Sequence, residues 1–288
     1  MVIFSSCSNN VEEIWVNKDG TGKYQSTVDL SDALPFIEMA LSAGEEEGAG
    51  NENPGLSKFK ELYSNGWIID TNFVVENILR DQAAKNGKTF TIESFMQEIF
   101  ESDKINEISG MQPSDKEKES FGNFMESLVK STVNIQLNKD ENLFKLVTSQ
   151  RFDGLNKIMF SGLTDFMEFA AKQEQESGKE IQDIEPMLGS IPQYKIKNNT
   201  LYITRNPVDL DAMDQDAQQS FQMAQMFMGK PDYKTIIHVP GKVKSVNQKN
   251  ASYKGSTVTW TIPYDDIYDS SKNLDLEIKF KPKKKLKY

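Results

Sequence analysis

The sequence predicts an α+β protein: an antiparallel β-sheet covered on one face by helices, with a helical insertion between its N-terminal and C-terminal strands. Three observations predict it. Both ends of the chain show apolar and polar residues in strict alternation, tight-turn signals join those segments, and the middle of the chain has helical spacing. Strands joined by tight turns must be antiparallel. Alternation implies one solvated and one covered face, and helices are the expected cover.

The first strands form a hairpin. Residues 11–16 are β-prone, and Asp19-Gly20 is a turn signal because this dipeptide tolerates positive φ. Tyr24 then begins an alternating strand that runs to Leu30. Ser31 is expected to cap a helix that reaches residue 42, and the Gly- and Glu-rich stretch 44–55 to be a surface loop.

The middle of the chain predicts helices. Apolar residues fall at helical spacing from Val74 to Ala83 and from Ile92 to Phe100. Ser114-x-x-Glu117 is a capping box that starts a third helix.

Strand patterns return afterwards. Alternation predicts strands at 133–137 and 143–147, a helix from Leu155 to Ala170, a hairpin at 194–203 and a helix at 212–228. The last fifty residues are expected to be β, with one strand from 235 to 246 that is broken or bulged near Pro240-Gly241, followed by strands at 258–262 and 274–280.

Composition excludes several function classes. The chain has 33 basic and 43 acidic residues, one Cys and one His in 288 residues, and a net charge of −10. A single Cys and a single His exclude disulfide frameworks and zinc clusters. The last ten residues hold six lysines and no acid, so the remainder is more acidic still. An acidic body repels phosphate backbones, so we expect no nucleic-acid binding. No apolar run reaches the roughly 18 residues that span a bilayer.

The first ten residues resemble the end of a bacterial lipoprotein signal. A short apolar stretch and two small residues precede Cys7, and polar Ser and Asn follow it. The sequence therefore predicts lipidation of Cys7, a membrane anchor and a place in the bacterial cell envelope, at the outer membrane or its periplasmic face. Phe4 stands where Leu is usual, and a complete signal has about 7–15 apolar residues. The alternative is a free Cys in the terminus.

We expect three parts: a signal remnant and tether at 1–10, a single body at 11–281 with a helical insertion at about 57–130, and a basic tail at 282–288.

Two segments carry a family resemblance. The C-terminal part of the chain resembles the signature of LppM-like domains of Bacteroidetes-type bacterial lipoproteins. The matching segments are Pro240-Gly241-Lys-Val243 through Asn247 and Lys254-Gly255 through Trp260 and Pro263, and residues 16–22 resemble the N-terminal hairpin of these domains. The resemblance implies an α+β fold likened to lipid-binding proteins, no catalytic residues, Trp260 in the core, and the N-terminal hairpin in one sheet with the C-terminal strands.

Candidate catalytic groups have plain structural interpretations. His238 has no clustered carboxylates, and Ser127-x-x-Lys130 lacks the partner motifs of serine acyltransferases. The Asn17–Val28 segment begins like a calcium loop, but Val28 takes the place of its final Glu. Acids at 209, 211, 214 and 216 suit a helix N-terminus. We therefore expect no enzyme activity, no metal and no cofactor.

Flexible Met and aromatic residues suit varied apolar ligands. The sequence predicts a lipid or amphipathic ligand between helices and sheet, lined by Phe166, Met167, Phe169, Met223, Met226, Phe227 and Met228. The same residues also fit an ordinary core. The alternatives are a structural or protein-interaction module of the envelope and a carboxylate-based hydrolase.

Overall fold

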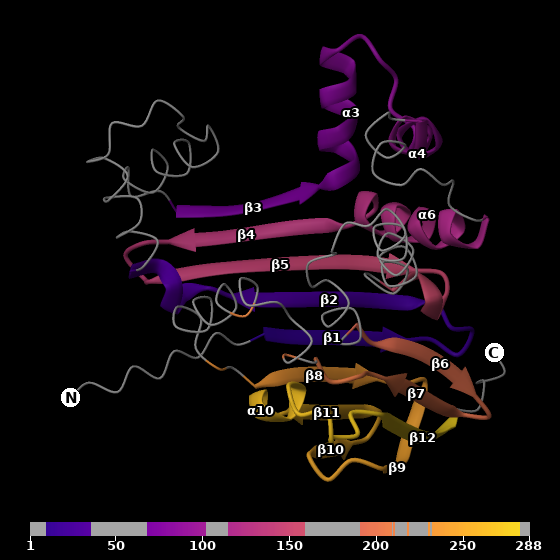
Figure 1. Cartoon of the computed structure of the whole chain (residues 1–288). Helices are drawn as coiled ribbons and strands as arrows, with labels where there is room; N and C mark the ends of the chain where they lie inside the picture. Colours follow the sequence, from indigo (N-terminus) through magenta and orange to yellow (C-terminus); the bar gives the residue numbers. More distant parts are fainter. Residues whose placement is uncertain are drawn as a thin grey trace, which may run out of the picture.

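Two β-sheets dominate the part of the chain that the structure, a computed structural model, describes: residues 10–35, 68–101, 115–158, 191–208, 210, 218, 230 and 232–282 (Figure 1). The long sheet has the strand order β10 (Ala251–Lys254), β11 (Thr257–Ile262), β8 (Tyr233–His238), β1 (Asn10–Val16), β2 (Gly22–Asp29), β5 (Leu143–Phe152), β4 (Thr132–Asn138) and β3 (Ile68–Val74). The short sheet has the order β6 (Gln193–Lys197), β7 (Thr200–Thr204), β12 (Leu276–Pro282) and β9 (Gly241–Val246).

Tight turns make the hairpins that the sequence predicts. Gly20 has a φ of 85° in the β1–β2 turn, and the Asp19 carboxylate accepts a hydrogen bond of 3.1 Å from the Thr21 amide. Asn198 and Asn199 have φ values of 51° and 58° in the β6–β7 turn. Gly and Asn take these positive φ values at the lowest steric cost, which fixes the register of the flanking strands.

The N-terminal hairpin shares a sheet with the C-terminal strands β8, β10 and β11, as the resemblance implied, but β9 and β12 lie in the short sheet, so that expectation holds only in part. β1 pairs with β8 in parallel, with Ile14 opposite Ile237, and β8 pairs with β11 in antiparallel orientation. Every other pair in both sheets is antiparallel. This one parallel pair connects strands more than two hundred residues apart.

The main core lies between the two sheets. Ile14 and Ile237 of the long sheet and Leu201 and Ile278 of the short sheet are all fully buried members of one apolar cluster. Trp260 of β11 is buried in the same cluster, as expected, and its indole N–H donates to the Asn250 side chain at 3.2 Å. Burial of apolar side chains from both sheets is the main source of stability.

The predicted strand 235–246 is two strands in different sheets. β8 ends at His238, and β9 begins at Gly241 in the short sheet. A Cβ on Gly241 would lie 2.1 Å from the Lys281 carbonyl oxygen, so only glycine fits where the chain crosses. The Pro240-Gly241 break therefore marks a change of sheet and not a bulge.

The predicted fold class is wrong. The described residues contain twelve strands but only four α-helices: α3 (Val75–Lys85), α4 (Ile92–Glu101), α6 (Asp115–Val129) and α10 (Tyr264–Ile267). Among the described residues, a second sheet and not a layer of helices covers the part of the long sheet that forms the main core. Alternation shows that a sheet face is covered but does not show by what, and the C-terminal strands supply an apolar face of their own. The expected helical insertion at 57–130 also contains a strand, β3.

Two further helix predictions need correction. The helix expected from Leu155 is a three-residue 3₁₀ turn, η2 (Leu155–Lys157), and Ile158 after it is extended and buried in the main core. Residues 159–170 of that prediction lie outside the described residues. The helix expected from residue 31 to residue 42 begins with a 3₁₀ turn, η1 (Ser31–Ala33), and continues as helix at residues 34 and 35, whereas residues 36–42 lie outside the described residues. The Ser31 hydroxyl donates to Asp29 and accepts a 3.0 Å hydrogen bond from the Phe144 amide, but it caps no amide of its own turn. In the described part of the chain, no helix has the length and apolarity needed to cross a membrane.

Candidate functional site

The long sheet has one apolar face, and among the described residues the short sheet packs on the part formed by β1, β2, β8, β11 and the end of β5 at Phe152. The strand registers continue this face onto β5, β4 and β3. They align Phe144, Leu137 and Ile69 in one cross-strand row and Leu146, Ile135 and Thr71 in the next. We call this outer part of the face, on β3, β4 and β5, the open face.

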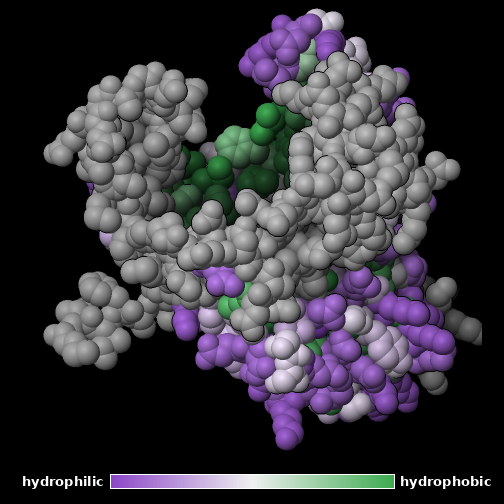
Figure 2. Space-filling view, viewed as in Figure 1, coloured by the Kyte–Doolittle hydropathy of each residue, from purple (hydrophilic) through white to green (hydrophobic). Residues whose placement is uncertain are grey.

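Much of the open face is only partly buried. Leu137 and Phe144 pack with Leu34 in a small second cluster. Ile69, Ile135, Leu146 and Leu30 contact that cluster but stay partly exposed. Figure 2 shows a hollow at the level of β3 and β4 with a hydrophobic floor. The open face is therefore an apolar surface that a ligand can contact.

Polar side chains separate the open face from the main core. Glu12 of β1 lies opposite Ser26 of β2, and Ser26 lies opposite Thr148 of β5, on the same face of the sheet as the apolar rows. The row continues with Val133 of β4. A polar row thus runs from the sheet interface to the open face.

A buried charge pair lies at the inner end of this row. The Glu12 carboxylate accepts a 2.7 Å hydrogen bond from the Tyr24 hydroxyl, and its other oxygen is 3.8 Å from Nη2 of Arg205. Arg205 follows β7 in the short sheet, and its guanidinium lies 4.0 Å from the centre of the Tyr233 ring. Two charges removed from water are costly unless paired, so this pair fixes how the sheets meet.

The surroundings shift the pKa values of these groups. Burial raises the pKa of Tyr24, and the nearby Glu12 carboxylate adds to the shift. Burial alone would lower the pKa of Arg205, but Tyr233 and Glu12 outweigh it and raise that pKa. At neutral pH Tyr24 is therefore neutral and donates its hydroxyl hydrogen, and Arg205 is a cation.

Several buried polar atoms of this region make no hydrogen bond with a described residue. They are Oδ1 of Asn10, Oε2 of Glu12, Oε1 of Gln150 and Nε of Arg205. Unsatisfied buried polar groups are rare, and each can form a hydrogen bond with water or with a ligand. They favour a polar ligand group at the inner end of the open face.

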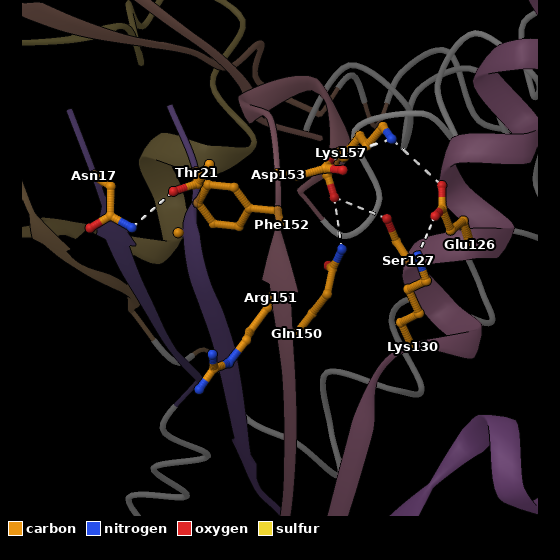
Figure 3. A pocket seen from close by; sticks show the side chains of 11 residues that line it. Asn17, Thr21, Glu126, Ser127, Lys130, Gln150, Arg151, Phe152, Asp153 and Lys157 are labelled. Atoms are coloured by element: carbon orange, nitrogen blue, oxygen red, sulfur yellow. Dashed lines mark hydrogen bonds and ion pairs between the residues drawn. The ribbon is translucent and has the colours of Figure 1, made fainter. Parts of the chain in front are cut away.

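A separate polar pocket of about 390 Å³ lies beside α6 and the end of β5 (Figure 3). Its lining residues are Asn17, Thr21, Gly22, Glu126, Ser127, Lys130, Gln150, Arg151, Phe152, Asp153 and Lys157. Most of its charges are paired with one another. Lys130 forms an ion pair with Glu126, and Lys157 lies 3.6 Å from Glu126 and 3.4 Å from Asp153. The hydrogen bond from Lys130 lowers the pKa of Glu126 despite its partial burial.

The pocket brings Ser127 and Lys130 close together, but not as a nucleophile and its base. The Ser127 hydroxyl donates to the Lys157 carbonyl at 2.9 Å, and the Lys130 ammonium points to Glu126 (Figure 3). Gln150 donates to the same carbonyl at 2.8 Å. These contacts attach α6 to β5 and η2, which is a structural role.

His238 lies on the opposite, more polar face of the long sheet. Its Nε2 is 2.6 Å from Glu13 and its Nδ1 is 3.1 Å from the Thr257 hydroxyl. Its ring stacks on Trp15 with centroids 5.1 Å apart. Lys23 lies over that indole at 4.8 Å from its centroid. The histidine links three strands. Across the described residues, no three His, Cys, Asp or Glu side chains are placed to hold a metal ion.

The predicted ligand-binding residues lie outside the described residues: Phe166, Met167, Phe169, Met223, Met226, Phe227 and Met228. Cys7 and the acids at 209, 211, 214 and 216 do so too. Sequence reasoning missed Glu12 and Arg205. Glu12 occupies an inward position in an alternating strand with Ile14 and Val16, and a charge at such a position signals a buried polar contact.

Comparisons with known proteins give one distant likeness. No protein-family model matches the chain, and no curated protein matches it. The chain is similar to the folded domain of LppM from Mycobacterium tuberculosis, solved by NMR, with 8% identity over 99% of this chain and 95% of that chain and a TM-score of 0.30. A likeness at this level supports no argument about fold or function, and it gives no support to the Bacteroidetes assignment.

Proposed function

We propose that this protein is a non-enzymatic protein of the bacterial cell envelope that binds the apolar part of a lipid or other amphipathic molecule on the open face. One observation carries the proposal. Ile69, Ile135 and Leu146 line an apolar sheet face and remain partly exposed, whereas the short sheet fully covers the same face on β1 and β8. Exposed apolar patches of this kind mark ligand or partner surfaces.

The polar row supports an amphipathic ligand. The row crosses four strand spacings of about 4.8 Å, which gives it a length of roughly 19 Å. Its residues in order are Glu12, Ser26, Thr148, Val133 and Phe73. Its inner end has buried polar atoms with unused hydrogen-bonding capacity, and its outer end is apolar. A ligand with a polar head and an apolar tail matches this gradient.

Ligand binding is tested on the purified chain and two variants. Organic extracts are examined by mass spectrometry, and uptake of a fluorescent fatty acid is titrated. Ile135→Asp places a charge on the open face, and Gln136→Asp places the same charge on the opposite face of the same strand. We expect at least tenfold weaker fatty-acid binding for Ile135→Asp alone, with both variants folded by circular dichroism. Absence of any lipid in the extract together with no uptake would refute the proposal.

Anchoring through Cys7 is part of the proposal. Its support is the sequence Phe4-Ser-Ser-Cys7-Ser, where small residues before the Cys give the lipoprotein peptidase access. Each buried CH₂ of an attached chain contributes about 0.8 kcal/mol to membrane affinity. In the native host, Cys7→Ala should abolish palmitate labelling, whereas Asn9→Ala should retain it. Labelling that survives Cys7→Ala excludes the anchor.

A protein-interaction module is the second candidate. Ile68 on β3 is 71% exposed and Ile78 on α3 is 52% exposed, and both lie at the outer edge of the long sheet. Exposed apolar residues beside an edge strand favour a protein partner. Cross-linking in membranes followed by pull-down separates the two candidates. If the protein is an interaction module, the double variant Ile68→Lys with Ile78→Lys loses its protein partner but keeps its uptake of fatty acid.

A further inference from the structure

The outer face of the short sheet is basic. Its four strands alternate apart from a register shift between β12 and β9, so one set of side chains packs in the main core and the other set faces outward. The outward set includes six exposed lysines: Lys195, Lys197, Lys242, Lys244, Lys279 and Lys281. We call this surface the basic face. Figure 2 shows hydrophilic residues over the lower, C-terminal part of the molecule.

The strand registers bring these lysines together. Lys281 of β12 lies directly opposite Lys242 of β9. Lys197 of β6 and Lys279 of β12 both lie opposite Thr200 of β7, on its two sides. Like charges placed opposite each other in a sheet are unfavourable unless an anion lies between them.

The basic face has little internal compensation. Glu277 is the one acidic residue among the outward positions of these four strands, and none of the six lysines forms an ion pair with a described residue. The whole chain nevertheless carries a net charge of −10. Positive charge is therefore concentrated on one face of an acidic protein.

A hollow lies at one end of this face. It has a volume of about 390 Å³ and is lined by Gly241, Lys242, Gly255, Ser256, Lys281 and Pro282. Two ammonium groups and a hydroxyl beside backbone without side chains provide a suitable contact for a phosphate oxygen.

We propose that the basic face docks on a membrane surface of anionic lipids, with a lipid phosphate in the hollow between Lys242 and Lys281. A planar lipid surface contacts all six lysines at once and keeps the acidic remainder of the protein at a distance, where salt screens it within about 10 Å. Tyr202 lies between Lys195 and Glu277 in the middle of the face, and Tyr suits the membrane–water interface. The proposal does not depend on ligand binding at the open face.

The test uses the unacylated full chain, so that no lipid anchor contributes. Binding is measured by flotation with vesicles of phosphatidylcholine, with and without 30% phosphatidylglycerol. The test variant carries Lys242→Gln, Lys279→Gln and Lys281→Gln. The matched control carries Lys18→Gln, Lys85→Gln and Lys234→Gln, which remove the same charge from exposed positions elsewhere. Thermal unfolding verifies that both variants fold.

We expect the chain to bind the vesicles that contain phosphatidylglycerol and not the vesicles of pure phosphatidylcholine, and we expect high salt to abolish this binding. Each lysine near an anionic membrane contributes about fivefold in affinity, so the test variant should bind about 100-fold more weakly and the control within about tenfold of the parent chain. Equal binding by the test variant and the control overturns the proposal. This holds even if deletion of residues 283–288 then abolishes binding, because the C-terminal tail and not the basic face would be the contact. Binding of heparin or single-stranded DNA without binding of vesicles assigns the face to a soluble polyanion and overturns it too.

Discussion

The Glu12 carboxylate and the Arg205 guanidinium face each other across the interface between the two sheets, with 3.8 Å between Oε2 and Nη2. Glu12 is the third residue of β1, and Arg205 directly follows β7. The pair is the one place among the described residues where a buried ion pair links the sheets, and it lies at the boundary between the main core and the open face.

Breaking this pair should be costly. Glu12→Ala leaves the Arg205 charge buried without a partner, which costs about 3–5 kcal/mol of unfolding free energy. Glu12→Ala combined with Arg205→Met should cost less than the sum of the two single variants, because no lone charge remains. Urea unfolding of the four proteins in a double-mutant cycle measures the coupling. Strict additivity would show that the two side chains do not interact.

Alkaline pH should unfold the protein cooperatively. Burial raises the pKa of Tyr24 in the folded protein, whereas the unfolded chain has the ordinary value of about 10. A raised folded-state pKa contributes stability that is complete below about pH 10 and falls as the pH rises further. Absorbance at 295 nm and circular dichroism should therefore change together above pH 10. Titration of all nine tyrosines with ordinary pKa values in a folded protein would contradict this.

Glycine should be essential at Gly22 and dispensable at Gly87. A Cβ on Gly22 would lie 1.9 Å from the Trp15 carbonyl oxygen and 2.4 Å from the Phe152 ring. Gly22→Ala should cost more than about 3 kcal/mol, at the upper end for single substitutions. Gly87 has a φ of 68° and open space around its Cα, so Gly87→Ala should cost only about 1 kcal/mol. Thermal unfolding compares the two, and equal losses would refute the clash.

Ser127 should act structurally and not as a nucleophile. Ser127→Ala removes the hydrogen bond to the Lys157 carbonyl and should cost about 1–2 kcal/mol. Fluorophosphonate and penicillin probes should not label the parent chain at this residue. The control variant Ser252→Ala changes an exposed serine of β10. Stoichiometric labelling at Ser127 would identify an acyl-enzyme and reverse the interpretation of the pocket.

The hairpins were predictable because their signals are local. Asp19-Gly20 and Asn198-Asn199 define their turns by backbone conformation alone, and the alternation of Tyr194, Ile196, Leu201 and Ile203 identifies the strands beside the second turn. Helices α3, α4 and α6 were predicted from apolar spacing for the same reason. β3 was missed, because its residues include Asp70, Thr71 and Asn72, which interrupt the apolar pattern.

The candidate site was less predictable. The sequence offered Met and Phe residues at 166–169 and 223–228 as ligand contacts, and these lie outside the described residues. The open face consists of ordinary strand residues such as Ile69 and Ile135, which the sequence cannot distinguish from core residues. Glu12 and Arg205 are 193 positions apart, and only the parallel pairing of β1 with β8 and the packing of the short sheet bring them together.

The sequence by itself determined the turns, most of the strands, the acidic balance of the chain and the basic character of its last residues. Period-two alternation and turn residues act through nearest neighbours, so they are readable without a fold. Only the tertiary structure decided that β8 and β9 belong to different sheets, that a second sheet covers the first, that the apolar face stays open on β3 to β5, and that six lysines share one surface. Each of these features depends on contacts between residues far apart in the chain. The pattern of neighbouring residues does not identify such a contact partner, so burial and charge at these positions follow only from the folded structure.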